Sequence, residues 1–95
     1  MAAYVIAQIE VTDWEKFQAY IKEAPRTISQ YGGKYIARGG ESVVLEGDAQ
    51  NKRMVLIEFP SLQHAKDWYN SEEYRQIKPL RMDAAQGLLI AVEGC

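Results

Sequence analysis

Cysteine and histidine are almost missing from this chain. Its 95 residues include one cysteine, Cys95, at the last position, and one histidine, His64. A lone cysteine cannot form an intramolecular disulfide or build a cysteine metal cluster, and we expect His64 to be a surface residue of a helix. Because a haem or metal group would lack its usual side-chain ligands, we expect no metal site and no cofactor.

A surplus of positive charge and a long apolar run are also missing. The 11 basic and 13 acidic residues give a formal net charge of −2, which disfavours binding to nucleic acid. Met1-Ala2-Ala3 leads straight into an expected strand, without the basic region or apolar segment of a signal peptide or a membrane span. We therefore expect a cytoplasmic protein with no nucleic-acid or membrane partner, folded as one domain over residues 1–95.

The first third of the chain predicts a strand followed by a helix. Residues 4–11 are rich in β-branched side chains, and their polar members fall at every second position. Thr12-x-x-Glu15 has the spacing of a capping box, and an apolar stripe then runs from Trp14 to Tyr31. Pro25 interrupts this stripe without shifting its phase, so we expect a bend or restart there rather than the end of the helix. Gly32-Gly33 ends it.

The middle of the chain predicts a hairpin. Strands are expected over 34–46 and 53–59, with a polar turn at 47–52 and a bulge at Gly39-Gly40.

The last third predicts two helices and a strand. Ser61 is the expected N-cap of a helix that buries Leu62, Ala65, Trp68 and Tyr69. Ser71 caps a short further helix through Ile77, Pro79 stops or kinks it, and a final strand follows at 88–93. The expected order of the main elements is βαββαβ.

Glycine pairs and aromatic spacings carry a family resemblance. The residues concerned are Tyr31-Gly32-Gly33-Lys34-Tyr35-Ile36-Ala37-Arg38-Gly39-Gly40-Glu41, Val43-Val44-Leu45-Glu46-Gly47, Ile57-Glu58-Phe59-Pro60-Ser61, Ala65-x-x-Trp68-Tyr69-Asn70-Ser71-x-x-Tyr74 and Arg81. With them the chain resembles, over nearly all its length, the small bacterial family called domain of unknown function 1330. The resemblance implies an α+β fold, namely a ferredoxin-like βαββαβ subunit with a four-stranded antiparallel sheet that pairs into a dimeric α+β barrel. It implies no particular reaction.

Alternation assigns two faces to the strands. The apolar set comprises Val5, Ala7, Ile9, Val11, Val55, Ile57, Phe59, Leu88, Ile90 and Val92, and the mixed set comprises Tyr4, Ile6, Gln8, Glu10, Met54, Leu56, Glu58, Leu89, Ala91 and Glu93. Two helices can cover only one face, so we expect the apolar face beneath them and the mixed face open. An open face this apolar predicts a partner, and we expect a homodimer that pairs sheet to sheet.

Three charged residues form the main candidate site. We expect the first and third strands to be neighbours and parallel, which would bring Glu10 and Glu58 together on the mixed face. Counting along the hairpin places Arg38 beside Glu58. An arginine between two carboxylates is either a structural ion network or an anion-binding group in a pocket.

Aromatic residues supply the remaining candidates. The chain has six tyrosines and two tryptophans, more than so small a core demands, and Tyr4, Tyr20, Trp68, Tyr69 and Tyr74 are either core residues or the lining of a ligand cavity. Arg81 either caps a helix end or meets an acidic ligand. The glycine pairs lack the strand-to-helix context of a phosphate-binding loop.

Two functions therefore remain open. The chain either binds or transforms a small organic molecule, in a pocket between sheet and helices or within the dimeric barrel, or it is a homodimeric module with no reaction of its own. Folds similar to the family host cofactor-independent monooxygenases, lactone isomerases and haem-dependent enzymes, which is an analogy of fold alone.

Overall fold

The computed structural model describes residues 1–48 and 52–95. Its elements are β1 (Ala3–Val11), α1 (Trp14–Gln30), β2 (Lys34–Arg38), β3 (Arg53–Phe59), α2 (Leu62–Tyr69), α3 (Glu72–Met82) and β4 (Ala85–Glu93). The expected turn at 47–52 lies partly outside the described residues. Among the described residues, no helix is both long and apolar enough to cross a membrane.

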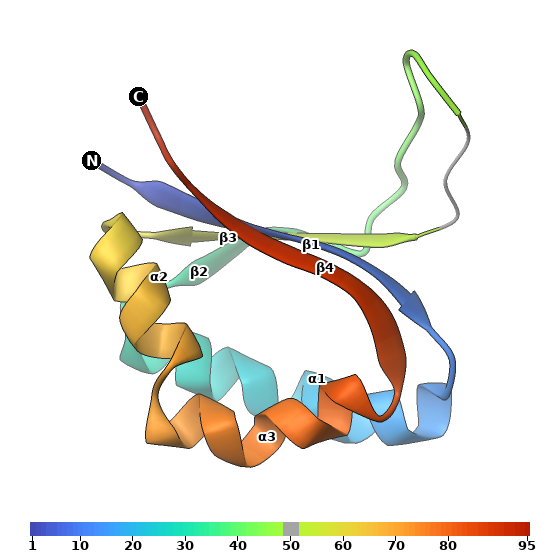
Figure 1. Ribbon diagram of the computed structural model, residues 1–95, viewed down its shortest axis with the longest axis horizontal. Coiled ribbons are helices and arrows are strands. Elements are labelled where there is room, and N and C mark those ends of the chain that lie inside the picture. The colour runs from blue at the N-terminus through green and yellow to red at the C-terminus, as the bar shows by residue number, and fades with distance from the viewer. Residues whose placement is uncertain (49–51) are drawn as a thin grey trace.

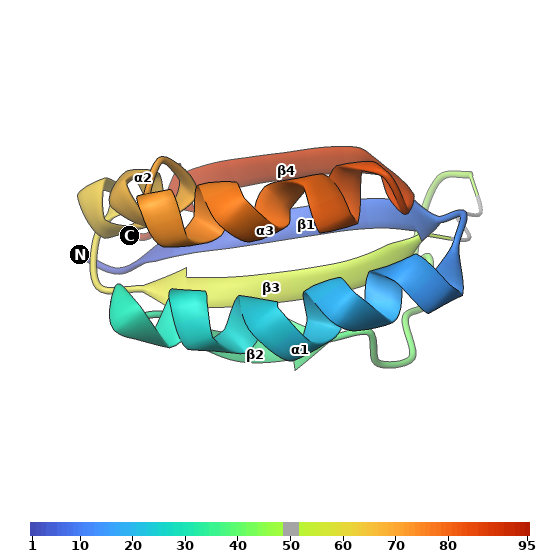
Figure 2. The same cartoon turned by 90° about the horizontal axis from the view of Figure 1, so that it is seen from below.

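The four strands form one sheet in the order β2-β3-β1-β4, and every neighbouring pair is antiparallel. All three helices lie on one side of this sheet, and α1 and α3 run side by side beneath it (Figures 1 and 2). Residues 39–48, which follow β2, rise on the other side (Figure 1). The ferredoxin-like α+β fold with a four-stranded antiparallel sheet is therefore confirmed.

The first helix begins one residue later than the capping box predicts. The Asp13 side chain, and not Thr12, accepts the Lys16 amide at 3.1 Å, and Asp13 has extended backbone angles. Thr12 instead bonds to the residue that precedes β4, since both its amide and its hydroxyl donate to the Ala84 carbonyl. The helix runs unbroken through Pro25 to Gln30, so the prediction that it does not end at the proline is confirmed.

Serine caps begin the other two helices as predicted. Ser61 accepts the His64 amide and Ser71 accepts the Tyr74 amide. Of the two expectations for Pro79, a stop or a kink, the stop is wrong, because α3 continues through Pro79 to Met82. Proline removes only its own hydrogen bond to the preceding turn, and the chain beyond keeps helical bonding.

The strand β2 is much shorter than predicted. It ends at Arg38, and residues 39–46 are not part of the sheet. The bulge lies at Ile36, between the pairs Tyr35–Ile57 and Ala37–Leu56, and not at the glycine pair. Gly39 has a φ of 68°, a value that favours glycine, and its amide donates to Met54 at the strand end.

The predicted faces hold for β1 and β3. Val5, Ala7, Ile9, Ile57 and Phe59 are buried beneath the helices.

The assignment is wrong for β4. Leu89 pairs with Ala7 and Ala91 with Val5, so these two share the helix-facing side. Leu88, Ile90 and Val92 lie on the open face, where they are 54%, 50% and 47% exposed. The open face is therefore more apolar than the sequence suggests.

Candidate functional site

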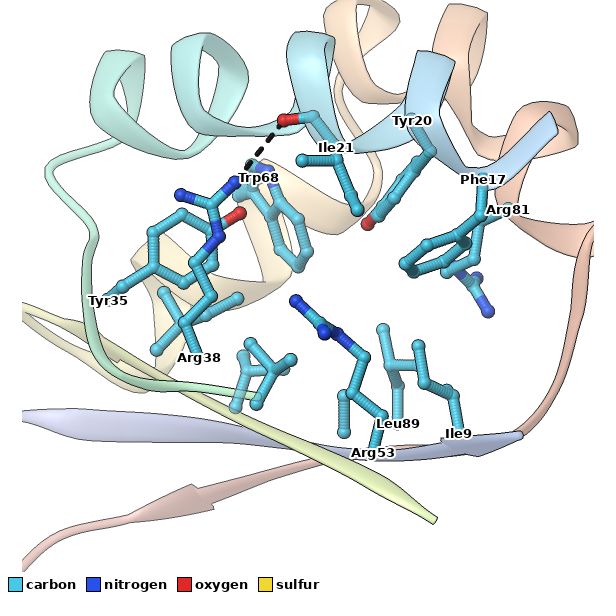
Figure 3. Close-up of a pocket in the computed structure, with 14 residues that line it drawn as sticks. Ile9, Phe17, Tyr20, Ile21, Tyr35, Arg38, Arg53, Trp68, Arg81 and Leu89 are labelled. Carbon is cyan, nitrogen blue, oxygen red and sulfur yellow. Dashed lines mark hydrogen bonds between the residues drawn. The ribbon is translucent and has the colours of Figure 1, made fainter. Parts of the chain in front are cut away.

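A cavity of about 40 Å³ lies between the sheet and the helices. Its floor consists of apolar side chains of the two inner strands, β1 and β3, and of the edge strand β4. These residues are Val5, Ala7, Ile9, Val55, Ile57 and Leu89. Phe17, Tyr20 and Ile21 of α1 and Trp68 of α2 cover it. Figure 3 shows Phe17, Tyr20 and Ile21 pointing down from α1, and Ile9 and Leu89 pointing up from the strands, toward one space.

Three arginines also line this cavity: Arg38 at the end of β2, Arg53 at the start of β3 and Arg81 in α3. No carboxylate stands among the lining residues that the structure describes. Within the same described part of the chain, none of the three forms an ion pair. The cavity therefore combines apolar walls with uncompensated positive charge.

Arg53 is the central cation. It has the same strand parity as Val55 and Ile57, so its guanidinium points from the sheet into the cavity (Figure 3). Its Nε atom is buried and has no hydrogen-bond partner among the described residues. The guanidinium lies 5.8 Å from the Trp14 ring centre and 5.9 Å from the Phe17 ring centre, distances at which a cation is attracted to an aromatic face.

Gly39 lies directly beside the Arg53 guanidinium. A Cβ atom at Gly39 would overlap the Arg53 guanidinium. The glycine at this position therefore allows a left-handed backbone and also leaves room for the Arg53 guanidinium.

Arg38 stands at the β2 side of the cavity. Its guanidinium lies 4.4 Å from the centre of the Tyr35 ring, and its Nη2 donates to the Ile21 carbonyl at 3.4 Å (Figure 3). That carbonyl is free because Pro25, four residues later in α1, has no amide hydrogen to donate to it. Burial raises the pKa of Tyr35, and Arg38 offsets part of that rise.

Arg81, Tyr74 and Tyr20 form a chain of hydrogen bonds at the other side. Arg81 Nε donates to the Tyr74 hydroxyl at 3.1 Å, and the Tyr74 and Tyr20 hydroxyls lie 2.9 Å apart. Burial raises the pKa of Tyr20 far above its ordinary value, and Tyr74 adds to that rise. Burial acts to lower the pKa of Arg81, but Tyr74 and Tyr20 outweigh it and the net pKa is raised. Tyr20 is therefore a neutral phenol beside a charged guanidinium.

Trp68 is a fixed wall of the cavity. Its indole Nε1 donates to the Thr27 hydroxyl at 3.1 Å, which in turn donates to the Ala24 carbonyl at 2.8 Å. Both Trp68 and Thr27 are buried, and these two hydrogen bonds give the indole N–H and the threonine hydroxyl the partners that buried polar groups need.

The expected cluster of Arg38, Glu10 and Glu58 does not exist. The strands β1 and β3 are antiparallel, and Glu58 pairs with Tyr4. Glu10 lies six residues farther along β1, which at ~3.4 Å per residue is roughly 20 Å away. Glu58 instead forms an ion pair of 3.2 Å with Lys34, while Arg38 pairs with Val55 on the opposite face of the sheet.

The other predicted site residues divide between two cavities. Tyr20, Trp68 and Arg81 line the cavity with the arginines, and Tyr74 lies directly behind it. Tyr69 lines a second, more open cavity of about 470 Å³ along the edge strand β4. Tyr4 is half-buried on the open face of the sheet. Val5, Trp68, Arg81 and Leu89 line both cavities.

Sequence reasoning missed Arg53, Tyr35 and Phe17. The signal for Arg53 was present, because an arginine shares the parity of Val55 and Ile57 on a face that is otherwise apolar. A charge in that register is unusual in a strand covered by helices.

Comparison with known families decides the family of the chain. The model of the family described as domain of unknown function (DUF1330) matches residues 2–95. The chain belongs to this family. No curated protein matches it in sequence.

Solved structures share the fold at low sequence identity. A protein of unknown function from Rhodopseudomonas palustris superposes with a TM-score of 0.78 at 18% identity, over 99% of this chain and 82% of that one. A cofactor-independent oxygenase from Streptomyces nogalater gives 0.71 at 6% identity, over 99% and 93%. A dimeric protein of unknown function with a ferredoxin-like fold from Bacteroides fragilis gives 0.56 at 12% identity, over 98% and 96%. At these identities the likeness concerns the fold alone.

Proposed function

We propose that this protein binds a small organic molecule in the cavity between the sheet and the helices α1, α2 and α3. The observation that carries the proposal is Arg53, a cation whose Nε is buried without a partner among the described residues while its guanidinium points into an apolar cavity. A buried donor without an acceptor is costly, and such groups persist where a ligand completes them. The oxygenase of the same fold is consistent with a ligand cavity in this architecture.

A cavity-filling substitution tests the proposal. Ala7 is buried and lines the cavity floor, so Ala7→Val occupies the space without adding charge. The labelled protein is titrated with small aromatic and aliphatic compounds, and amide chemical shifts locate each binding event. We expect compounds that shift cavity residues in the parent and lose their effect in Ala7→Val.

The control is Ala37→Val, a matching substitution in a strand. Ala37 is exposed and pairs with Leu56 on the open face, so this variant should bind like the parent. The proposal fails if no compound shifts the cavity residues, or if the two variants respond alike.

We also propose that a second copy of the chain covers the open face of the sheet. Leu88, Ile90 and Val92 are about half exposed there, and the solved structure from Bacteroides fragilis is described as dimeric. Burying an apolar side chain gains ~1.5–3 kcal/mol, so a half-exposed one still gains about 1 kcal/mol, and each residue counts twice in a symmetric pair. A homodimeric module without a ligand remains the alternative function, and the cavity titration separates the two.

A further inference from the structure

We infer that the cavity takes a small organic carboxylate, whose charged group is held by Arg53 while the Tyr20 hydroxyl donates a hydrogen bond to it. This inference rests on the proposed function and names the class of ligand. Three observations support it: the positive charges that line the cavity, the direction of the Tyr20 hydroxyl proton, and the apolar cavity walls.

The charges favour an anion. Arg38, Arg53 and Arg81 line the same cavity, and no carboxylate lines it among the described residues. The Arg53 guanidinium lies near the Trp14 and Phe17 rings and beside Gly39, and its buried Nε lacks an acceptor in the described part of the chain. A planar guanidinium fork matches a carboxylate, and burial strengthens the bond between them.

The hydrogen-bond chain fixes the direction of the Tyr20 proton. Arginine has no acceptor, so Arg81 Nε must donate to the Tyr74 oxygen. Tyr74 is fully buried, and among the described residues its own proton has one acceptor within reach, the Tyr20 oxygen at 2.9 Å.

Tyr20 therefore accepts from Tyr74, and its own proton is left for the cavity that it lines. Figure 3 shows its hydroxyl and the Arg53 guanidinium pointing into the same space. The positive charge of Arg81 polarises this chain and makes Tyr20 a stronger donor toward an anion.

The walls limit the size and charge of the ligand. A free volume of about 40 Å³ holds a few water molecules, since each needs roughly 10–15 Å³ on this measure. A larger body must displace a side chain, and Arg38 is the exposed wall, held to α1 by a single long bond of 3.4 Å. A singly charged head with a short apolar body can place that body against Phe17 and Leu89, whereas a phosphate has no apolar part for these walls to contact.

Matched acids and amides test the inference. The probes are benzoate, phenylacetate and hexanoate, each paired with its primary amide, and inorganic phosphate. The side-chain N–H signals of Arg53 and Trp68 report binding by NMR. We expect at least one acid to bind 10-fold or more tightly than its amide and to shift both signals. In Arg53→Met the affinity for the acid should fall to that for its amide. In Tyr20→Phe the affinity for the acid should fall 3- to 10-fold.

The control variant is Arg26→Met, since Arg26 lies on the outer surface in an ion pair with Glu23 and should leave the preference unchanged. Arg53→Gln replaces Arg53→Met if the latter does not fold. Amides that bind as tightly as their acids would overturn the carboxylate inference and leave the small-molecule proposal standing. Phosphate binding more tightly than every acid would overturn the ligand class. If no probe shifts Trp68, the inference is wrong, and the wider compound titration decides the proposed function separately.

Discussion

Replacing Arg53 by methionine should stabilise the protein. The substitution removes a guanidinium whose Nε is buried without an acceptor among the described residues and which shares its cavity with Arg38 and Arg81. Methionine keeps the length of the stem and can remain against Phe17 and Trp14. A residue kept for a ligand, and not for the fold, is the kind whose removal raises stability.

The expected gain follows from three contributions. Leaving a buried donor unsatisfied costs ~1–3 kcal/mol, and the variant no longer bears that cost. The variant loses two cation–ring contacts at 5.8 and 5.9 Å, worth ~0.5–1 kcal/mol each at partly exposed sites. Sulfur–aromatic contacts of the new thioether return ~0.3–1.5 kcal/mol. The net result is a gain of about 1 kcal/mol, which for a domain of this size corresponds to a rise in Tm of roughly 4–8 °C.

Urea and thermal unfolding of the ligand-free protein measure this effect. Arg26→Met serves as the control, because its exposed ion pair with Glu23 contributes only ~0–1 kcal/mol and cannot give a gain when lost. A loss of 1 kcal/mol or more in Arg53→Met would refute the reasoning. It would show that Arg53 stabilises the packing of β3 against α1, contrary to the proposal that it is present to bind a ligand.

Three further predictions concern other parts of the molecule. Gly39→Ala should lower the free energy of unfolding by ~1–2 kcal/mol, because φ is 68° and the new Cβ meets Arg53; in urea unfolding, adding Arg53→Met should recover part of the loss, and no recovery would contradict the contact. Ile90→Lys on the open face should give a monomer of 10.8 kDa by light scattering. The control Ala19→Lys, at an exposed position of α1, should stay dimeric. If Ile90→Lys leaves the assembly unchanged, the interface lies elsewhere. The folded pKa of Tyr20 lies above its unfolded value of 10.0, so the stability it provides is present below about pH 10 and falls as the pH rises beyond it. Tyr20→Phe should therefore show a smaller alkaline loss of stability in unfolding measured between about pH 9 and pH 11, and an identical loss would argue against a buried phenol.

The facing of a strand can be predicted only where one of its two sides is polar. In β1 the polar residues Gln8 and Glu10 mark the open side, and the structure confirms that choice. In β4 the only charged residue is Glu93, and it marks the wrong side, because it stands at the strand end opposite the buried Ala3. Pairing with β1 decides the matter, because Leu89 lies opposite the buried Ala7 and a neighbouring pair must share a face.

The strand direction, in contrast, could have been worked out in advance. A strand, a helix and a second strand in one sheet form a crossover in which the two strands are parallel. The strand β3 returns from β2 as a hairpin, and it must therefore run against β1 as well. The prediction of adjacent Glu10 and Glu58 depended on the opposite direction, and it failed with that assumption.

Residues that break local rules gather around the cavity. Pro25 sits inside a helix and leaves the Ile21 carbonyl free for Arg38. Gly39 takes a left-handed backbone and leaves room for Arg53, which is itself a charge on the apolar face of the sheet.

Pro25 and Arg53 do not favour the local elements in which they occur, since proline weakens a helix and an unpaired arginine weakens a core. A sequence that served stability alone would have different residues at positions 25 and 53. Because such conflicts in natural proteins concentrate where function requires them, their convergence on one cavity is an argument for a ligand site that does not depend on the identity of the ligand.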